Sequence, residues 1–274
     1  LTYKIERIMM NVVEAQKTMF GVTKERQGDS VQGNLILSLK GISKTFDVGD
    51  NKQTVLNAVS MDVREHEFLA VMGPSGAGKT TLLNIMGGLE IPDEGEIFFQ
   101  NKKIDTSDFK QASRFRAEHI GFIFQNYNLV DELSVRENIE LASTIKGNYK
   151  KVREKIPAIC KKLQIEQFLD HYPIKLSGGE RQRCACARAL CKQADFILAD
   201  EPTGALDRRT TTNLVQLFQQ MIQEEGISVV LVTHDPFVAS FSNRVIFIQD
   251  GTITDELTSN TGRESFYQQI VMKL

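Results

Sequence analysis

Net charge, cysteine and long apolar runs are all scarce in this sequence. Its 274 residues carry 33 Lys and Arg against 35 Asp and Glu, which gives a formal net charge of −2. That balance offers no electrostatic attraction for nucleic acid or for an anionic lipid surface. The longest apolar runs, such as residues 229–232, are far shorter than the about 20 residues that a membrane-spanning helix needs. We therefore expect neither a nucleic-acid partner nor a direct membrane span.

The few cysteines argue against both a disulfide framework and a metal site. Besides Cys160 there are only Cys184, Cys186 and Cys191, which fall in one stretch with helical character. Residues i and i+2 of a helix point to different faces, no CxxC pair exists, and the nearest upstream histidine, His171, lies in another segment. We see no secretory signal before them, so we expect reduced, structural thiols in a cytoplasmic setting.

Two parts of the chain differ in character. Hydrophobic residues make up 41% of the sequence, which is typical of a folded globular protein. Apolar residues recur at helical spacing up to Phe20, and the polar residues 27–30 then indicate a linker. We expect residues 1–33 to be an amphipathic appendage to a main domain of residues 34–274. It docks on that domain or on a partner, or it reflects only where the chain was taken to begin.

The main domain has the pattern of an α/β protein. Short stretches of apolar or alternating residues indicate strands at residues 35–39, 55–63, 67–72, 196–199, 228–232, 244–248 and 252–254. Helical periodicity dominates residues 105–175, which we interpret as an inserted helical subdomain. The dipeptide Asp250-Gly251 indicates a hairpin between the last two strands, and a closing helix begins near Arg263.

A glycine-rich loop follows the strand that ends at Met72. It reads Gly73, Pro74, Ser75, Gly76, Ala77, Gly78, Lys79 and Thr80, and it fits the pattern G-x-x-x-x-G-K-[ST] at every fixed position. In such a loop the backbone N–H groups surround phosphate oxygens, and the N-terminus of the following helix adds a favourable dipole. Lys79 would reach the β- and γ-phosphates, and the hydroxyl of Thr80 would bind Mg²⁺. A plain glycine turn would not need this Lys-Thr pair.

A second apolar strand, residues 196–199, ends in two carboxylates. Asp200 lies where it can hold the water shell of Mg²⁺, and Glu201 lies where it can polarise an attacking water. Two acids at an ordinary strand end are usually only solvated charges. Here the apolar strand, together with the metal partner that the glycine-rich loop requires, favours a functional role.

The string LSGGERQR occupies residues 176–183. It resembles the signature of the ATP-binding-cassette (ABC) ATPases, with Glu180 where that family most often has Gln. Ser177 and the free N–H groups of Gly178 and Gly179 form an anion site at the start of a helix. The resemblance implies that the bound phosphate belongs to a second copy of the chain, so that two cassettes enclose two ATP molecules head to tail.

Other positions match the same family in order along the chain. Phe46 matches the aromatic residue, usually Tyr, that stacks on adenine. The resemblance also implies that Thr81, which follows the glycine-rich loop directly, contributes to nucleotide binding. Gln125 matches the Q-loop glutamine that contacts the metal and the water. Asp207 matches the D-loop that crosses the dimer interface, and His234 matches the switch histidine that contacts the γ-phosphate.

The resemblance covers about residues 35–274. It implies an ATPase that uses ATP and Mg²⁺, with catalytic roles for Glu201, His234, Gln125 and Lys79 and metal contacts from Thr80, Gln125 and Asp200. The implied fold is α/β. Its P-loop core has a mixed sheet flanked by helices, an antiparallel β subdomain and an inserted α-helical subdomain.

Finer features resemble one branch of this family. Residues 121–129 and 199–207 are similar to the macrolide-exporter and lipoprotein-release group, and residues 232–248 with the tail from 263 to 270 are most similar to BceA-type ATPases. Those proteins partner a large membrane permease and confer resistance to bacitracin-like peptides. The resemblance thus implies a homodimer of cassettes that is held at the cytoplasmic face of the membrane by a permease, with the contact near residues 125–130.

Several other functions stay open. Lipoprotein release, cell-division signalling and macrolide export are transport alternatives, because a cassette alone does not touch the cargo. A soluble ABC protein of translation or DNA repair would normally carry two cassettes or long insertions. A non-catalytic regulatory cassette would be expected to lack Glu201, His234 or Lys79, and all three are present.

Overall fold

The computed structural model describes residues 34–274 apart from residues 50, 144–148, 193 and 261. The chain divides into two units, Leu1–Gly33 and Asn34–Leu274, and all the described residues belong to the second. The amphipathic appendage that we predict for residues 1–33 therefore lies outside the described residues.

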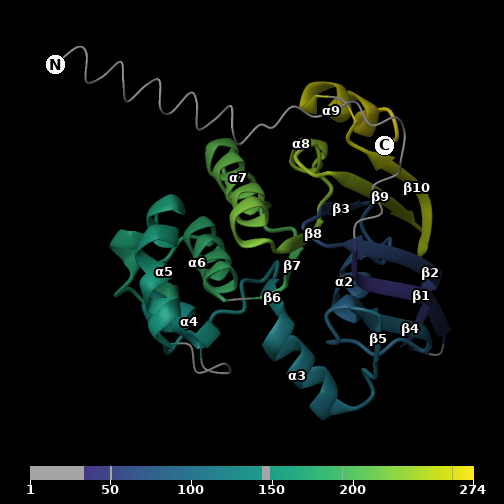
Figure 1. Ribbon diagram of the computed structural model, residues 1–274, viewed down its shortest axis with the longest axis horizontal. Coiled ribbons are helices and arrows are strands. Elements are labelled where there is room, and N and C mark those ends of the chain that lie inside the picture. Colours follow the sequence, from purple (N-terminus) through teal and green to yellow (C-terminus); the bar gives the residue numbers. More distant parts are fainter. Residues whose placement is uncertain (1–33, 50, 144–148, 193, 261) are drawn as a thin grey trace. The chain divides into compact units, whose positions relative to one another are not determined.

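A six-stranded sheet forms the centre of the second unit (Figure 1). Its strands, in spatial order, are β10 (Thr252–Thr258), β9 (Arg244–Gln249), β3 (Phe68–Met72), β8 (Ser228–Val232), β7 (Phe196–Asp200) and β6 (Ile120–Ile123). Neighbouring strands are parallel except that β10 runs antiparallel to β9. Every residue of β3, β7 and β8 is buried, because parallel strands are covered on both faces. This burial explains their unbroken apolar sequences. The antiparallel β10 beside five parallel strands confirms the predicted mixed sheet.

A four-stranded antiparallel sheet packs on one face of the central sheet. Its strands, in spatial order, are β2 (Asn51–Arg64), β1 (Leu35–Val48), β4 (Glu94–Phe99) and β5 (Lys102–Ile104). Leu69 and Val230 of the central sheet share a core with Leu37 and Leu56 of this sheet, and Leu83 of α2 (Lys79–Met86) joins the same core. The predicted antiparallel subdomain is therefore confirmed.

The opposite face of the central sheet packs against helices. Because successive strand residues point to opposite faces, Phe68, Ile197 and Val229 contribute to a second core. The ring of Phe68 meets the ring of Phe218 edge-on, with centroids 6.1 Å apart. Phe218 lies on α7 (Arg208–Glu225), the helix that follows β7 and the loop after it. This packing holds α7 against the face of the sheet at β3 and β8.

The stretch of residues 105–175 is not uniformly helical. It contains β6, which pairs residue by residue with β7 in the central sheet. The apolar run of β6 has only four residues and follows α3 (Phe109–His119) directly. A run this short has the same hydrophobic pattern in a strand as in a helix, so only the pairing with β7 identifies the strand. The remaining helices of this part of the chain are α4 (Val135–Glu140), α5 (Tyr149–Lys162) and α6 (Gly178–Cys191), with η1 (Leu141–Ser143), η2 (Glu166–Phe168) and η3 (Pro173–Lys175). Of these, α6 packs on β6, where a Cβ atom on Gly121 would lie 3.1 Å from the carbonyl oxygen of Ala189. Two further helices, α8 (Pro236–Ala239) and α9 (Arg263–Val271), lie near the C-terminal end.

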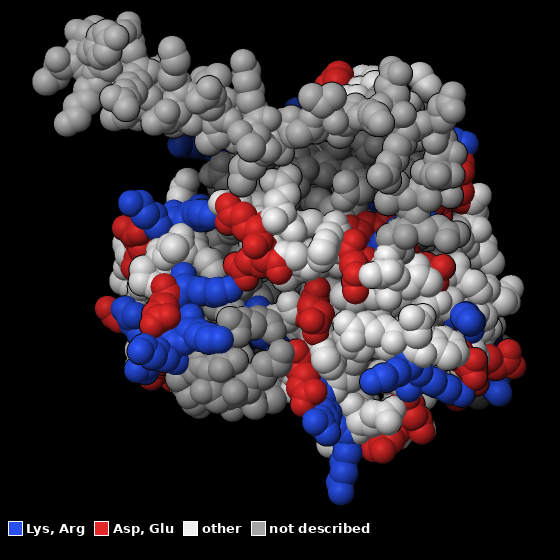
Figure 2. Space-filling view, in the orientation of Figure 1, with Lys and Arg blue, Asp and Glu red and all other residues white. Residues whose placement is uncertain are grey.

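The lobe formed by α4, α5 and α6 carries charges of both signs on the face shown in Figure 2. On this lobe Arg153 pairs with Glu140 at 2.8 Å, and Lys155 of α5 pairs with Glu225 at the end of α7 at 2.5 Å. The basic side chains of α5 are thus partly neutralised by local acids. In the part of the chain that the structure describes, no helix is both long enough and apolar enough to cross a bilayer.

All four cysteines are free and buried. Burial raises the pKa of the Cys160, Cys184 and Cys186 thiols to about 12, and it raises the pKa of Cys191 as well. No group of three or more His, Cys, Asp or Glu among the described residues can hold a metal ion. The four thiols lie in the packed interior, which agrees with the predicted structural role.

We expect these thiols to be inert in the folded protein. Because burial raises their pKa values well above 8, the reactive thiolate is almost absent at pH 8, and burial also blocks access. Titration with Ellman's reagent at pH 8 should detect no fast-reacting thiol in the native protein and four after unfolding in guanidinium chloride. A thiol that reacts in the native protein as fast as free cysteine would contradict this assignment.

Candidate functional site

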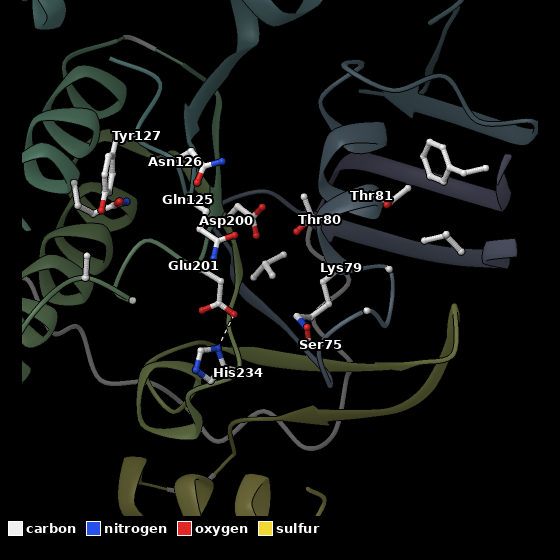
Figure 3. A pocket seen from close by; sticks show the side chains of 18 of the residues that line it. Ser75, Lys79, Thr80, Thr81, Gln125, Asn126, Tyr127, Asp200, Glu201 and His234 are labelled. Atoms are coloured by element: carbon white, nitrogen blue, oxygen red, sulfur yellow. Dashed lines mark hydrogen bonds and ion pairs between the residues drawn. The ribbon is translucent and has the colours of Figure 1, made fainter. Parts of the chain in front are cut away.

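A cleft of about 1080 Å³ lies at the carboxyl edge of the central sheet (Figure 3). Eleven of the predicted site residues line it: Phe46, Ser75, Gly76, Gly78, Lys79, Thr80, Thr81, Gln125, Asp200, Glu201 and His234. All of them except Phe46 lie at or just after the carboxyl ends of four strands, and the parallel arrangement of β3, β6, β7 and β8 brings these strand ends to one edge. The cleft thus brings together residues that are spread over almost 190 positions of the sequence, from Phe46 to His234.

The glycine-rich loop is squeezed between two strands. A Cβ atom on Gly73 would lie 2.0 Å from the carbonyl oxygen of Ile248 in β9, and one on Gly78 would lie 2.6 Å from the carbonyl oxygen of Val55 in β2. Gly78 also has a φ of +97°, a backbone angle that residues with a Cβ atom rarely adopt. Glycine is required at both positions because the backbone itself fills the space.

Lys79 is the first residue of α2, and its ammonium group turns back over the loop. Its Nζ donates to the carbonyl oxygens of Gly73 at 2.9 Å and Pro74 at 2.8 Å. The positive charge therefore lies at the mouth of the loop, where the free N–H groups of the helix N-terminus also point. A lysine combined with a helix N-terminus is suited to bind phosphate.

Asp200 supplies a buried carboxylate opposite the loop. Only 5% of the residue is exposed, and its Oδ1 atom has no hydrogen-bond partner. Burial raises the pKa of Asp200, and the nearby Glu201 carboxylate adds to the rise, whereas a hydrogen bond with Thr80 and the charge of Lys79 oppose it. An unpartnered buried carboxylate oxygen next to a hydroxyl is the kind of donor set that a hard divalent cation satisfies. The residues therefore fit Mg²⁺.

Glu201 occupies an unusual backbone position. Its φ of +45° is in the left-handed region, where residues with a Cβ are strained. Its N–H donates to the carbonyl oxygen of Val232 at 3.0 Å, which extends the pairing of β7 and β8 by one residue and holds the turn. The carboxylate is 14% exposed and faces the cleft. Such strain is common where a side chain must be aimed at a reacting group.

His234 partners this carboxylate. Its Nδ1 lies 2.8 Å from Oε1 of Glu201, and its ring is 73% exposed (Figure 3). The chain leaves β8 through Thr233, whose N–H donates to the carbonyl oxygen of Val71, and Asp235 caps α8 through the N–H of Phe237. These local bonds direct His234 towards the cleft.

The other predicted side chains have different neighbours. Phe46 lies inside β1, not after a strand, and the ammonium of Lys44 lies 5.2 Å from its ring centroid. Gln125 lies just beyond the end of β6. In Figure 3 the side chain of Gln125 is drawn next to Asp200, and Thr80 and Lys79 stand opposite them. An amide beside a buried carboxylate can complete the oxygen set for a cation.

Ser177, Gly178, Gly179, Glu180 and Asp207 are not among the residues that line this cleft. Ser177 and Glu180 form a reciprocal capping box at the start of α6, in which Oε2 of Glu180 accepts the N–H of Ser177 at 2.8 Å. Because Gln can close the same box, the Glu at position 180 preserves this local structure. Asp207 caps α7 by accepting the N–H groups of Arg209 and Thr210. Gly73, Pro74 and Ala77 support the loop and likewise do not line the cleft.

Sequence reasoning missed several residues that line the cleft, of which three are informative. Gln53 and Val55 lie on β2, and the hairpin register places Gln53 opposite Phe46. Nothing in the local sequence indicates that register. Gln182 of α6 is 1% exposed, and its Nε2 has no hydrogen-bond partner. It lies four residues before the buried Cys186, so its place on the buried face of the helix could have been read from the spacing.

The closeness of Gly78 to β2 generates a prediction. Gly78→Ala should destabilise the fold and abolish binding of trinitrophenyl-ATP, because the new methyl group would overlap the backbone of Val55. Gly49→Ala is the matched control. Gly49 also has a positive φ, of +61°, but its Cβ would meet no atom within 4 Å, so that variant should lose only about 1–2 kcal/mol of unfolding free energy and bind normally. Normal nucleotide binding by Gly78→Ala would contradict this account of the loop.

The sequence was compared with known proteins. The family model described as ABC transporter matches residues 56–204. Among curated relatives, the bacitracin export ATP-binding protein BceA of Halalkalibacterium halodurans is 40% identical over 238 residues, which cover 86% of this chain and 94% of that protein. The macrolide export ATP-binding/permease protein MacB of Shewanella sp. is 38% identical over 222 residues. That match covers 81% of this chain and 34% of MacB.

A solved structure has the same fold. The dimeric, post-hydrolysis ATP-binding cassette MJ0796 of Methanocaldococcus jannaschii, bound to ADP and Pi, superposes with a TM-score of 0.75 at 38% identity. The match covers 82% of this chain and 99% of that one. The family match, these identities and the shared fold lead to one conclusion: the chain belongs to the ABC transporter family of ATP-binding ATPases.

Proposed function

We propose that this chain hydrolyses ATP as a homodimer and thereby drives an integral membrane permease, to which it is bound at the cytoplasmic face of the membrane. One observation carries the proposal. Glu201, aimed by a strained backbone and hydrogen-bonded to His234, faces the phosphate loop across one cleft. A carboxylate so placed beside a lysine and a helix N-terminus is suited to promote attack of water on a terminal phosphate.

Each side of the cleft has its own task in this proposal. Lys79 and the N–H groups of the loop bind the β- and γ-phosphates, and the ring of Phe46 stacks on adenine. Thr80, Asp200 and Gln125 would hold Mg²⁺, which would satisfy Oδ1 of Asp200, a buried oxygen without a hydrogen-bond partner. When bound, Mg²⁺ neutralises charge on the phosphate oxygens.

Glu201 is the general base in this proposal. It accepts a proton from the attacking water, and the hydrogen bond with His234 keeps the carboxylate in one orientation. The exposed edge of the His234 ring remains available to the γ-phosphate. Fixing both groups before the reaction lowers the entropic part of the barrier.

A second copy of the chain would complete each site. The N-terminus of α6 at Ser177, Gly178 and Gly179 does not line the cleft of its own chain, yet it is capped and exposes N–H groups as an anion site does. Two chains arranged head to tail would bring this terminus to the γ-phosphate of the partner, with the segment around Asp207 at the interface. The dimeric state of the MJ0796 cassette supports the arrangement.

The permease would contact the chain beside the Q-loop. Asn126 and Asn128 line the surface there, and Val130 is 39% exposed. These residues lie between the central sheet and the lobe of α4, α5 and α6, so a helix docked on them would touch both parts. Closure of the dimer would then move the docked helix.

Resistance to bacitracin-like peptides is the cargo role that we favour within this proposal. The 40% sequence identity with the bacitracin export protein BceA, in a match that covers 94% of BceA, supports this role. Macrolide export, lipoprotein release and cell-division signalling remain the transport alternatives, and the similarity to MacB is the observation in favour of macrolide export.

Glu201→Gln tests the chemistry. The amide cannot accept the proton, so kcat for ATP hydrolysis should fall by about 100-fold or more while nucleotide binding persists. Sedimentation or size-exclusion chromatography with ATP should then show an accumulated dimer. Glu264→Gln, an exposed change on α9, is the matched control. Wild-type turnover in Glu201→Gln would remove the assigned base, and a monomer in saturating ATP would remove the homodimer.

The partner and the cargo need a second experiment. The tagged chain is purified from detergent-solubilised membranes, its partner is identified by mass spectrometry, and ATP hydrolysis by the complex is measured with and without bacitracin. We expect a large permease and turnover that changes with the peptide concentration. A response to a macrolide and none to bacitracin would favour macrolide export, and a soluble partner alone would contradict the transport role.

A further inference from the structure

The segment that follows Gln125 has a strained backbone. Tyr127 and Asn128 are consecutive residues with φ values of +64° and +48°, in the left-handed region that favours glycine. Two local turns support the shape: the N–H of Tyr127 donates to the carbonyl oxygen of Phe124 at 3.1 Å, and the N–H of Asn128 donates to the carbonyl oxygen of Asn126 at 2.6 Å. Left-handed backbone is costly at residues with a Cβ atom, so a restraint from outside the segment would stabilise it.

Arg188 supplies that restraint. Its Nη2 donates to the carbonyl oxygen of Tyr127 at 2.9 Å, and its Nη1 donates to the carbonyl oxygen of Asn128 at 2.5 Å. The planar guanidinium fork matches two adjacent carbonyls only while both residues keep their left-handed conformation. Arg188 lies on the third turn of α6, the helix that begins with the signature segment.

A second contact ties the same segment to the start of α6. A Cβ atom on Gly178 would lie 3.1 Å from the hydroxyl oxygen of Tyr127, so the Tyr127 side chain packs directly on the first turn. The guanidinium of Arg181 lies 5.9 Å from the centroid of the Tyr127 ring. In Figure 3 the Tyr127 side chain stands beside the helices, on the far side of Gln125 from Lys79. The segment after Gln125 therefore contacts α6 at two places, its first turn and its third turn.

We propose that Arg188 is a positioning residue for ATP hydrolysis: it holds Tyr127 and Asn128 in the left-handed conformation and so fixes where Gln125 lies relative to Asp200. The inference rests on the proposed role of Gln125 as a metal contact. The guanidinium of Arg188 binds the carbonyl oxygens of Tyr127 and Asn128 and does not itself line the cleft, so we expect it to make no direct contact with bound nucleotide. Its loss should lower kcat and raise the Mg²⁺ concentration needed for half-maximal rate, with an unchanged Kd for nucleotide.

The decisive experiment is a double-mutant cycle on the full chain. Arg188→Ala should lower kcat by about 10- to 100-fold, because a misplaced contact group raises the barrier, while the Kd for trinitrophenyl-ATP stays within about twofold. In an Asn128→Gly background the same Arg188→Ala change should cost only about threefold, because glycine adopts the left-handed conformation without a restraint. Arg114→Ala, which removes an exposed arginine paired with Glu118, is the matched control and should leave kcat unchanged.

Folding defects are separated by a second variant. Arg188→Met keeps the aliphatic stem in place and removes only the fork, and Tm is measured for every variant. An equal loss of kcat in the wild-type and Asn128→Gly backgrounds, or wild-type kcat in both Arg188 variants, overturns the inference. Gln125→Ala separates it from the proposed function. If Gln125→Ala lowers kcat and Arg188→Met does not, only the positioning role fails; if Gln125→Ala and Glu201→Gln both hydrolyse ATP normally, the proposed site itself fails.

Discussion

The site depends on one constraint: neighbouring parallel strands end at the same edge of their sheet. Lys79 follows β3, Gln125 follows β6, Glu201 follows β7 and His234 follows β8, so all four side chains come to one cleft. Parallel strands must be covered on both faces, and the antiparallel sheet and the helices provide that cover. The same burial that stabilises the sheet therefore also positions the loops that line the cleft.

Two features of the cleft are unfavourable for the isolated fold and useful for chemistry. Asp200 is a buried carboxylate with a raised pKa and an unpartnered oxygen, and Glu201 next to it has a strained backbone. Burial of a charge and left-handed backbone at a residue with a Cβ both oppose folding. A bound cation would relieve the first, and the pairing of β7 with β8 sustains the second. Stability and function thus compete at two adjacent residues.

Helix α6 connects the parts that must act together. Its N-terminus carries the capped signature segment, its first turn packs on Tyr127, and its third turn holds the carbonyl oxygens of Tyr127 and Asn128 through Arg188. The carbonyl oxygen of Ala205, in the loop after β7, also lies close to the helix, 3.1 Å from the position that a Cβ on Gly179 would take. A displacement of α6 would therefore change its contacts with the segment after Gln125 and with the loop after Glu201.

The sequence by itself determined the local chemistry of this protein. The phosphate loop, the paired acids at the end of an apolar strand and the capped signature segment are each contained in a few consecutive residues, so local rules suffice to find them. Tertiary structure decided the rest. The pairing of β6 with β7, the register that sets Gln53 opposite Phe46 and the reach of Arg188 to Tyr127 join residues that local patterns do not connect. Such contacts depend on packing and pairing between separate segments, which no local pattern encodes.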